Sequence, residues 1–178
     1  LPLDRLIVLG LLAGVFIALG GAFFTAVMAE LPPGHGPSRL LGGVAFSTGL
    51  LLVCMSGAEL STGNCMTVAA WASGSFTTRE VRRNLLVSYT ANAVGALALV
   101  LLIAGSGLLQ TGHGRVAAAI AEAKMNLSFE QAFVRGILCN ALVCMAIWMT
   151  LAGRSVIDGE RIVHIEQAAA LPRGREHG

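Results

Sequence analysis

Four polar side chains stand close together in an otherwise apolar part of the chain: Glu59, Ser61, Thr62 and Asn64. A carboxylate, two hydroxyls and a carboxamide can hydrogen-bond either to unwound backbone or to a polar solute. Inside a membrane, ionisable residues and broken helices mark solute paths. The alternative is a structural kink whose end these groups cap. We expect an interrupted helix that lines a solute path, with Glu59 holding the loop as a cap rather than carrying protons.

Asn140 is a second strongly polar residue, and it lies deep in another apolar run. Val143 follows it on the same helical face. Phe46 and Leu50 likewise share a helical face, which leads into the first polar stretch. Packing alone would explain any one of these apolar residues. Two faces that each bring a polar residue to a similar depth favour a pore, with Asn140 facing protein or the pore itself.

The composition places the chain in a membrane. It has 178 residues, of which 55% are hydrophobic and 12% are charged, and its mean hydropathy is +0.74. A soluble domain of this size is less apolar. The 12 basic and 10 acidic residues leave a net charge of +2, which does not indicate a nucleic-acid partner. The partner that the composition does predict is the lipid bilayer.

Four apolar runs are long enough to cross about 30 Å of hydrocarbon as helices. Three of them are uninterrupted, and the remaining one contains the first polar stretch, so it is predicted to be a broken helix. The predicted fold class is an all-α integral membrane protein with four transmembrane segments, the second of them broken. The spans are residues 6–28, 40–72 with the break at 59–64, 85–109 and 132–151, in a transmembrane domain 1–158 that precedes a polar C-terminal tail 159–178.

The loop between the second and third spans is rich in arginine, since it contains Arg79, Arg82 and Arg83. Basic residues collect on the cytoplasmic side of membrane proteins. With four crossings, the N-terminus and the C-terminal tail are then predicted to be cytoplasmic as well. Thr77 or Thr78 is the predicted N-cap of the third span.

Small residues predict close contacts between spans. Gly10 and Gly14 form a GxxxG pair, and Ala91 with Gly95 forms a similar one. We expect these contacts to form within one subunit. The four cysteines lack metal-ligand spacing, and the chain has no phosphate loop, cofactor motif or pairing of a nucleophile with a base. We therefore expect no cofactor, no metal site and no enzymatic activity.

Several motifs, in one order along the chain, resemble the formate/nitrite transporter family. They are GAELSTGN at residues 57–64, ASG at residues 72–74, AEAKMN at residues 121–126 and RGILCNALVCMAIWM at residues 135–149. The resemblance implies an aquaporin-like helical bundle with one pore per subunit, assembled as a homopentamer in the inner (cytoplasmic) membrane. It also implies a channel or transporter for small monovalent anions such as formate or nitrite.

The resemblance further implies two apolar constrictions along the pore. Phe46 and Val143 match the outer constriction, and Leu50 and Leu60 match the inner one. Ser61 departs from the family pattern, because the family often has Phe at this position. We therefore expect a wider outer slit in this chain, whose selectivity the family pattern does not define.

Three polar residues match the family's centre and vestibule. Thr62 matches the residue of the broken-helix loop that faces the centre of the pore, Asn140 its partner from the fourth span, and Lys124 a basic residue of the outer vestibule. Moving a bare anion into low dielectric costs roughly tens of kcal/mol, whereas protonating a carboxylate of pKa about 4 at pH 7 costs about 4 kcal/mol. Passage as the neutral acid is therefore cheaper. The family is thought to supply the proton from a histidine in a second broken helix.

That second broken helix has no counterpart in this chain. Residues 159–178 are GERIVHIEQAAALPRGREHG, without an apolar run long enough to cross a membrane. His164 lies in this polar tail, outside the family's histidine context. We therefore expect a chain truncated after the fourth span, which lacks the family's last two spans. The alternative to a channel is a non-conducting remnant or an accessory membrane subunit.

We expect that this chain alone does not form a proton-coupled pore, because half of the inverted repeat and its histidine are absent from it. The measurement is formate uptake into liposomes that contain the chain, at several external pH values. Uptake that depends on pH and is as fast as that of a six-span relative would contradict this expectation.

Overall fold

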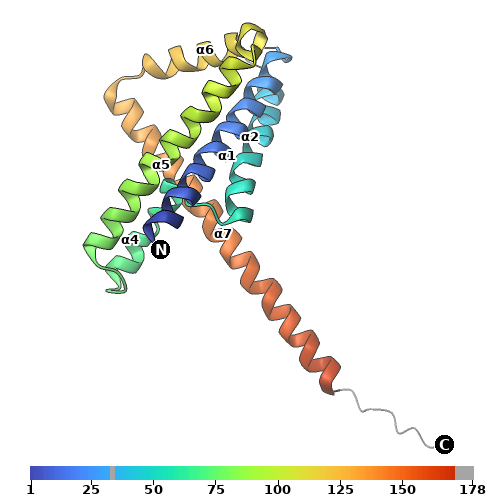
Figure 1. Cartoon of the computed structure of the whole chain (residues 1–178). Helices are drawn as coiled ribbons and strands as arrows, with labels where there is room; N and C mark the ends of the chain where they lie inside the picture. The colour runs from blue at the N-terminus through green and yellow to red at the C-terminus, as the bar shows by residue number, and fades with distance from the viewer. Residues whose placement is uncertain (33–34, 171–178) are drawn as a thin grey trace, which may run out of the picture. The chain divides into compact units, whose positions relative to one another are not determined.

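The computed structural model describes residues 1–32 and 35–170, with the side chains of residues 1–32 and 35–150. The chain divides into two compact units, Leu1–Cys144 and Met145–Gly178, and every contact discussed below lies within the first. Helices and their connections make up the described part (Figure 1). In chain order they are α1 (Leu3–Ala29), α2 (Gly36–Ser56), α3 (Ser61–Asn64), α4 (Thr67–Ala72), α5 (Thr78–Gly105), the 3-10 turn η1 (Leu108–Gln110), α6 (Gly112–Met125) and α7 (Phe129–Ala170).

Four of these helices are long and apolar enough to cross a membrane: α1, α2, α5 and the part of α7 from Phe129 to Thr150. The second predicted span is divided among α2, α3 and α4, so it is a broken helix. The predicted all-α fold with four segments, the second of them broken, is confirmed in the part of the chain that the structure describes.

The regions between and after the spans contain more helix than the sequence indicated. α6 is too polar to cross a membrane, so a search for apolar runs passes over it, although alanines make its centre a good helix former. α7 continues to Ala170. No helix end marks the predicted boundary at residue 158, and the division into a domain 1–158 and a tail 159–178 stays a prediction; residues 171–178 lie outside the described residues.

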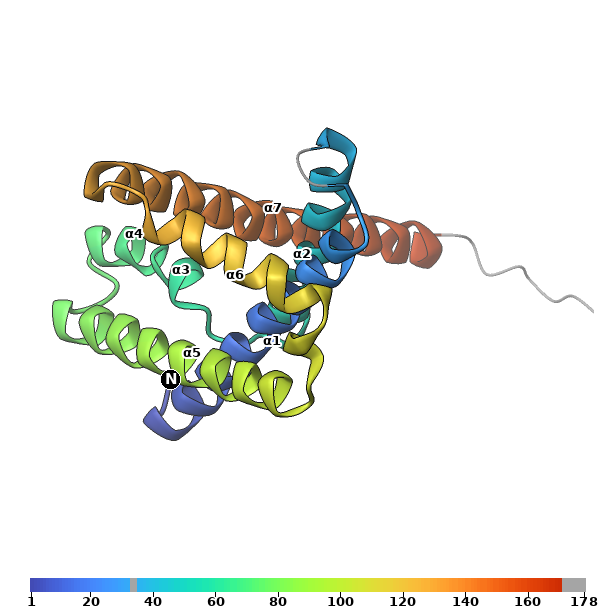
Figure 2. The same cartoon turned by 90° about the horizontal axis from the view of Figure 1, so that it is seen from above.

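α1 lies between α5 and α2, and small residues allow the close approach on both sides (Figures 1 and 2). On α1, Gly10 and Gly14 face α5, where a Cβ on Gly10 would lie 2.7 Å from the Cβ of Ala91. A Cβ on Gly14 would collide with the backbone carbonyl of Asn92. Gly95 of α5 meets the backbone of α1 in the same way. The contacts predicted from the two small-residue pairs therefore form within the chain.

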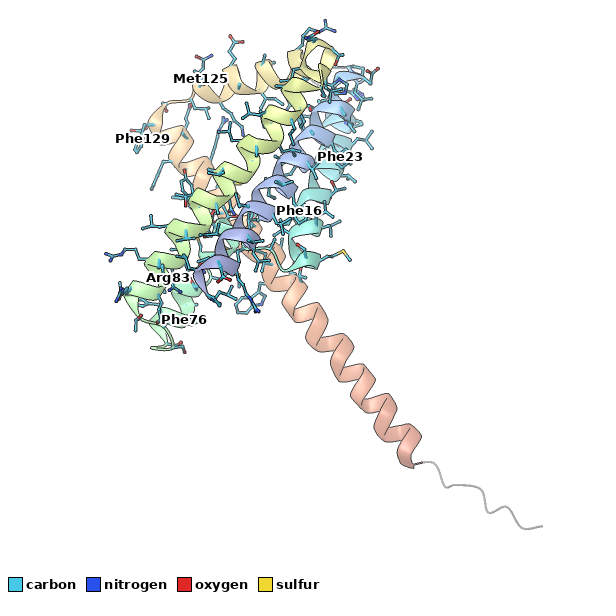
Figure 3. All side chains as sticks on the ribbon, in the orientation of Figure 1. Phe16, Phe23, Phe76, Arg83, Met125 and Phe129 are labelled. Atoms are coloured by element: carbon cyan, nitrogen blue, oxygen red, sulfur yellow. The ribbon has the colours of Figure 1, made fainter. Side chains whose placement is uncertain are left out.

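The start of α1 and the start of α5 lie at the same end of the first unit. The guanidinium of Arg83 donates through Nη2 to the backbone carbonyl of Leu1, at 3.0 Å. Figure 3 shows Arg83 and Phe76 at this end. Thr77 begins α5 as its N-cap, in a capping box with Glu80, which confirms one of the two residues predicted for this role. The arginine-rich loop and the N-terminal residues are thus on one side, as the predicted topology requires.

We predict that Gly14→Ala destabilises the protein by about 1–3 kcal/mol, the usual cost of overpacking. The added methyl group forces α1 away from the backbone of α5 at Asn92. Gly21→Ala is the matched control in the same helix, because a Cβ there meets nothing within 4 Å. Thermal unfolding in detergent measures both variants. Equal melting temperatures for the two would contradict the close packing of α1 on α5.

Candidate functional site

The break in the second span begins at a glycine. Gly57 ends α2 in the left-handed conformation, with φ of 66°, and its N–H donates to the carbonyl of Val53. Glycine adopts this conformation without the steric cost of a Cβ. The N–H of Ala58 also returns to Val53, at 3.1 Å. The helix therefore stops at Ser56, residues 57–60 are non-helical, and the hydroxyl-bearing Ser61 and Thr62 start α3 rather than lying in the interruption.

The backbone groups freed by the break find partners on α1 and α5. The N–H of Glu59 donates to the carbonyl of Leu9 on α1, at 3.2 Å. The N–H of Ser61 donates to Oδ1 of Asn92 on α5, at 2.9 Å. Nδ2 of Asn92 donates to the carbonyls of Gly10, at 2.8 Å, and of Glu59, at 2.9 Å. One carboxamide thus joins two helices to the loop, which meets the demand for internal hydrogen bonds in a membrane.

The carboxylate of Glu59 is bound by side chains of the broken segment and of α5. Its Oε2 accepts from Nδ2 of Asn64 at 2.7 Å. Nδ2 of Asn64 also donates to Oδ1 of Asn84 on α5, at 2.9 Å. A carboxylate at this position is expected to accept from freed backbone amides, but in the structure its hydrogen bond comes from the side chain of Asn64. Glu59 is half-buried and tied to the loop, which supports its predicted role as a cap.

Asn84 and Asn92 are not among the residues predicted from the sequence, although a signal for Asn92 is present. Asn92 lies deep in the apolar run 85–109, and the same argument had singled out Asn140 in the fourth span. Asn92 lies in the unbroken α5, four residues after the buried Ser88. Its partners are backbone groups of α1 and of the loop, which no pattern in the sequence displays.

The backbone of Thr62 is hydrogen-bonded to Cys144 of α7. Sγ of Cys144 donates to the carbonyl of Thr62, and Sγ of Cys65 donates to the carbonyl of Ser61, each at 3.5 Å. Asn140, the predicted partner of Thr62, has a buried Oδ1 without a hydrogen-bond partner among the described residues. The structure thus brings α7 to the loop beside Thr62, and the predicted pairing of Thr62 with Asn140 stays a prediction.

A cavity of about 630 Å³ lies among α1, α2, α5, η1 and α6. Its walls are mostly apolar, and Phe46 and Lys124 both line it, which places a predicted constriction residue and the predicted vestibule residue at one cavity. His113 lines it too, and its Nδ1 lies 2.7 Å from Oγ1 of Thr111. His113 stands in the first turn of α6.

The other predicted constriction residues lie outside the lining of this cavity. Leu50 is half-buried on α2, Leu60 is half-buried directly before α3, and Val143 is half-buried on α7. Leu60 is the last residue of the break, and Glu59 and Ser61 on either side of it bond to Asn92. The constriction roles of these three residues remain predictions.

Comparison with known proteins agrees with the fold. The Formate/nitrite transporter family matches residues 1–166. Formate channel FocA of Escherichia coli (strain K12) is 38% identical over 173 residues, covering 95% of this chain and 61% of that protein. Uncharacterized transporter YrhG of Bacillus subtilis (strain 168) is 39% identical over 158 residues, covering 86% of this chain and 59% of the relative.

A solved structure shares the fold. It is described as a pentameric formate channel with formate bound, and it matches with a TM-score of 0.78 and 36% identity over 84% of this chain and 60% of that one. The chain therefore spans about three-fifths of the length of these relatives. The match of the family over most of the chain, together with the broken second span, shows that this protein belongs to the formate/nitrite transporter family.

Proposed function

We propose that the protein carries small monovalent anions, formate and nitrite among them, across a membrane. The observation that carries this proposal is the break at residues 57–60, whose backbone is satisfied inside the helix bundle by Asn92, Leu9 and Val53. Any helix broken inside a membrane needs partners for its freed backbone groups, and broken helices at the centre of transporters line the solute site. The relatives described as formate channels supply the class of solute.

The proposed path combines attraction at its mouth with apolar walls. Lys124 lines the cavity of about 630 Å³ and attracts an anion, and Phe46 lines the same cavity as the outer constriction. Leu50 and Leu60 form the inner constriction in this proposal. Apolar constrictions discriminate against the bare anion, because a desolvated charge in low dielectric is far more costly than a neutral acid.

The centre of the proposed path is the broken-helix loop. Thr62 presents its hydroxyl there and Asn140 faces it from α7 together with Val143. Oδ1 of Asn140 is buried and has no partner in the described part of the chain, which supports this placement, since such an atom is costly unless a ligand or water satisfies it. Ser61 adjoins Thr62 at the start of α3, where a small side chain leaves more space than an aromatic one.

The assembly and orientation are part of the proposal. We propose a homopentamer in the inner membrane, with the N-terminus and the arginine-rich loop on the cytoplasmic side. The solved relative is described as pentameric, and the contact of Arg83 with Leu1 keeps both segments at one end. All the relatives named above are described as channels or transporters, which favours conduction over the non-conducting alternative.

Uptake into liposomes tests the function. The protein that carries this chain is reconstituted, and entry of radiolabelled formate and of nitrite is measured without a pH gradient, beside empty liposomes. We expect both anions to enter faster than in the empty liposomes. Entry at the rate of empty liposomes, with protein shown to be folded and inserted, would refute the proposal.

Lys124→Gln tests the role of the cavity in the same assay. We expect the KM for formate to rise roughly twofold to fivefold at low salt, which corresponds to the modest energy of an exposed charge. At about 1 M salt the effect disappears, because the screening length falls to about 3 Å. Arg115→Gln is the matched control, since Arg115 lies on the same helix and does not line the cavity. A KM that rises equally in both variants would contradict a specific role for Lys124.

A further inference from the structure

The carboxamide of Asn92 makes three of its four possible hydrogen bonds in one place. Both N–H groups of Nδ2 donate, one to Gly10 and one to Glu59, and Oδ1 accepts from the N–H of Ser61. The distances are 2.8, 2.9 and 2.9 Å in the order Gly10, Glu59, Ser61. A side chain bonded in three directions has no freedom to rotate without breaking bonds. Asn92 is therefore a rigid connection among α1, α5 and the loop.

The packing of α1 on α5 sets where this carboxamide lies. Gly14 allows α1 to rest against the backbone carbonyl of Asn92, and Gly95, one turn along, receives the backbone of α1 at Leu11. Nδ2 of Asn92 lies 3.6 Å from the position that a Cβ on Gly10 would occupy. The helix contact thus fixes the backbone of Asn92, and the hydrogen bond to Gly10 fixes its side chain.

The two loop residues that Asn92 holds surround the predicted inner constriction. Glu59 and Ser61 flank Leu60, so the backbone on both sides of Leu60 is bonded to one side chain. Thr62 follows Ser61 directly. The position of Asn92 therefore determines how far Leu60 and Thr62 project from the loop.

We propose that Asn92 is the positioning residue of the anion path and sets its selectivity for size through Leu60 and Thr62. The inference rests on the proposed function, because it needs a path on which the two residues act. Among the described residues, the side chain of Asn92 hydrogen-bonds to backbone of the loop and of α1, so it acts through the residues it holds rather than on the anion itself.

Loss of the carboxamide leaves the N–H of Ser61 and the carbonyl of Glu59 without these partners. In a membrane such groups must find water or another polar group. The loop then moves toward water, and the constriction at Leu60 widens. Larger anions gain entry relative to formate, whereas a simple loss of folded protein would lower the rates for all anions by one factor.

The ratio of acetate uptake to formate uptake is the readout, because it does not depend on the amount of folded protein. We expect Asn92→Leu, which has a similar volume and no polar atom, to raise this ratio roughly threefold to tenfold, the range of one or two lost hydrogen bonds. Asn92→Asp keeps an acceptor for Ser61 and loses the donors, so its ratio lies between those of the leucine variant and the unaltered protein. Thr90→Val is the control on α5, since its hydroxyl bonds only to α5 itself.

Two variants at Ser61 test the hydrogen bond between the Ser61 N–H and Asn92 from the loop. Ser61→Pro deletes the N–H that donates to Asn92, and proline is well tolerated at the first position of a helix, which Ser61 occupies in α3. Leu60 has φ of −88° and ψ of 121°, the extended conformation that a residue before proline prefers. Ser61→Ala keeps the N–H and loses only the hydroxyl. We expect Ser61→Pro to raise the acetate-to-formate ratio and Ser61→Ala to raise it less.

The outcomes separate this inference from the proposed function. If the unaltered protein takes up neither anion, the proposed function fails. If it takes up formate and the ratio stays unchanged in Asn92→Leu, Asn92→Asp and Ser61→Pro while total uptake falls, Asn92 is only a structural residue and the inference is overturned. If Asn92→Leu does not fold, the ratios of Asn92→Asp and of Ser61→Pro against Ser61→Ala decide in the same way.

Discussion

An unwound helix inside a membrane must find its hydrogen-bond partners within the protein, and the rest of this structure follows from that requirement. The break after Gly57 frees N–H and C=O groups that a continuous helix would have paired. α1 supplies the carbonyl of Leu9, and α5 supplies both ends of the Asn92 carboxamide. The broken segment therefore needs these two helices close by, and it holds its shape only while they stay there.

The small residues of α1 and α5 serve the same requirement. A carboxamide reaches only a short distance from its backbone, so Asn92 can bond to Gly10 only if the two helices are almost in backbone contact. Gly14 and Gly95 permit that contact, since neither carries a Cβ at the crossing. Helix packing and loop geometry are thus coupled. A side chain larger than hydrogen at the crossing would displace α1, and the displacement would be transmitted to the loop through Asn92.

The sequence predicted the elements better than it predicted their connections. Hydrophobic length found the four spans, and the polar run from Glu59 to Asn64 found the broken one, because both properties are local. The small-residue pairs correctly indicated contacts within the chain, since spacing on a helix face is also local. Asn92 escaped notice, because its partners are backbone groups far away in the chain, and backbone groups leave no mark on the sequence.

The carboxylate of Glu59 is a second case in which the sequence does not reveal the hydrogen-bond partner. Glu59 is predicted to tie the loop, with freed amides of the loop or of the start of the following helix as its donors. In the structure those amides go to α1 and α5, and the carboxylate turns to Asn64, which Asn84 orients. Which donor meets which acceptor is a competition settled by three-dimensional proximity, so a sequence can supply the right groups without indicating how they pair.

The chemistry of the groups that hold the loop suits the proposed path for anions. A lysine or arginine in place of Asn92 could also donate to carbonyls, but its charge would bind an anion in low dielectric too firmly to release it. A carboxylate there would repel the anion. The carboxamide is neutral, donates and accepts at once, and leaves the charge of Lys124 at the cavity as the attraction from outside. The positive charge of Lys124 attracts the anion into the cavity, and the neutral carboxamide of Asn92 holds the loop without binding the anion. An anion can therefore enter the path and also leave it.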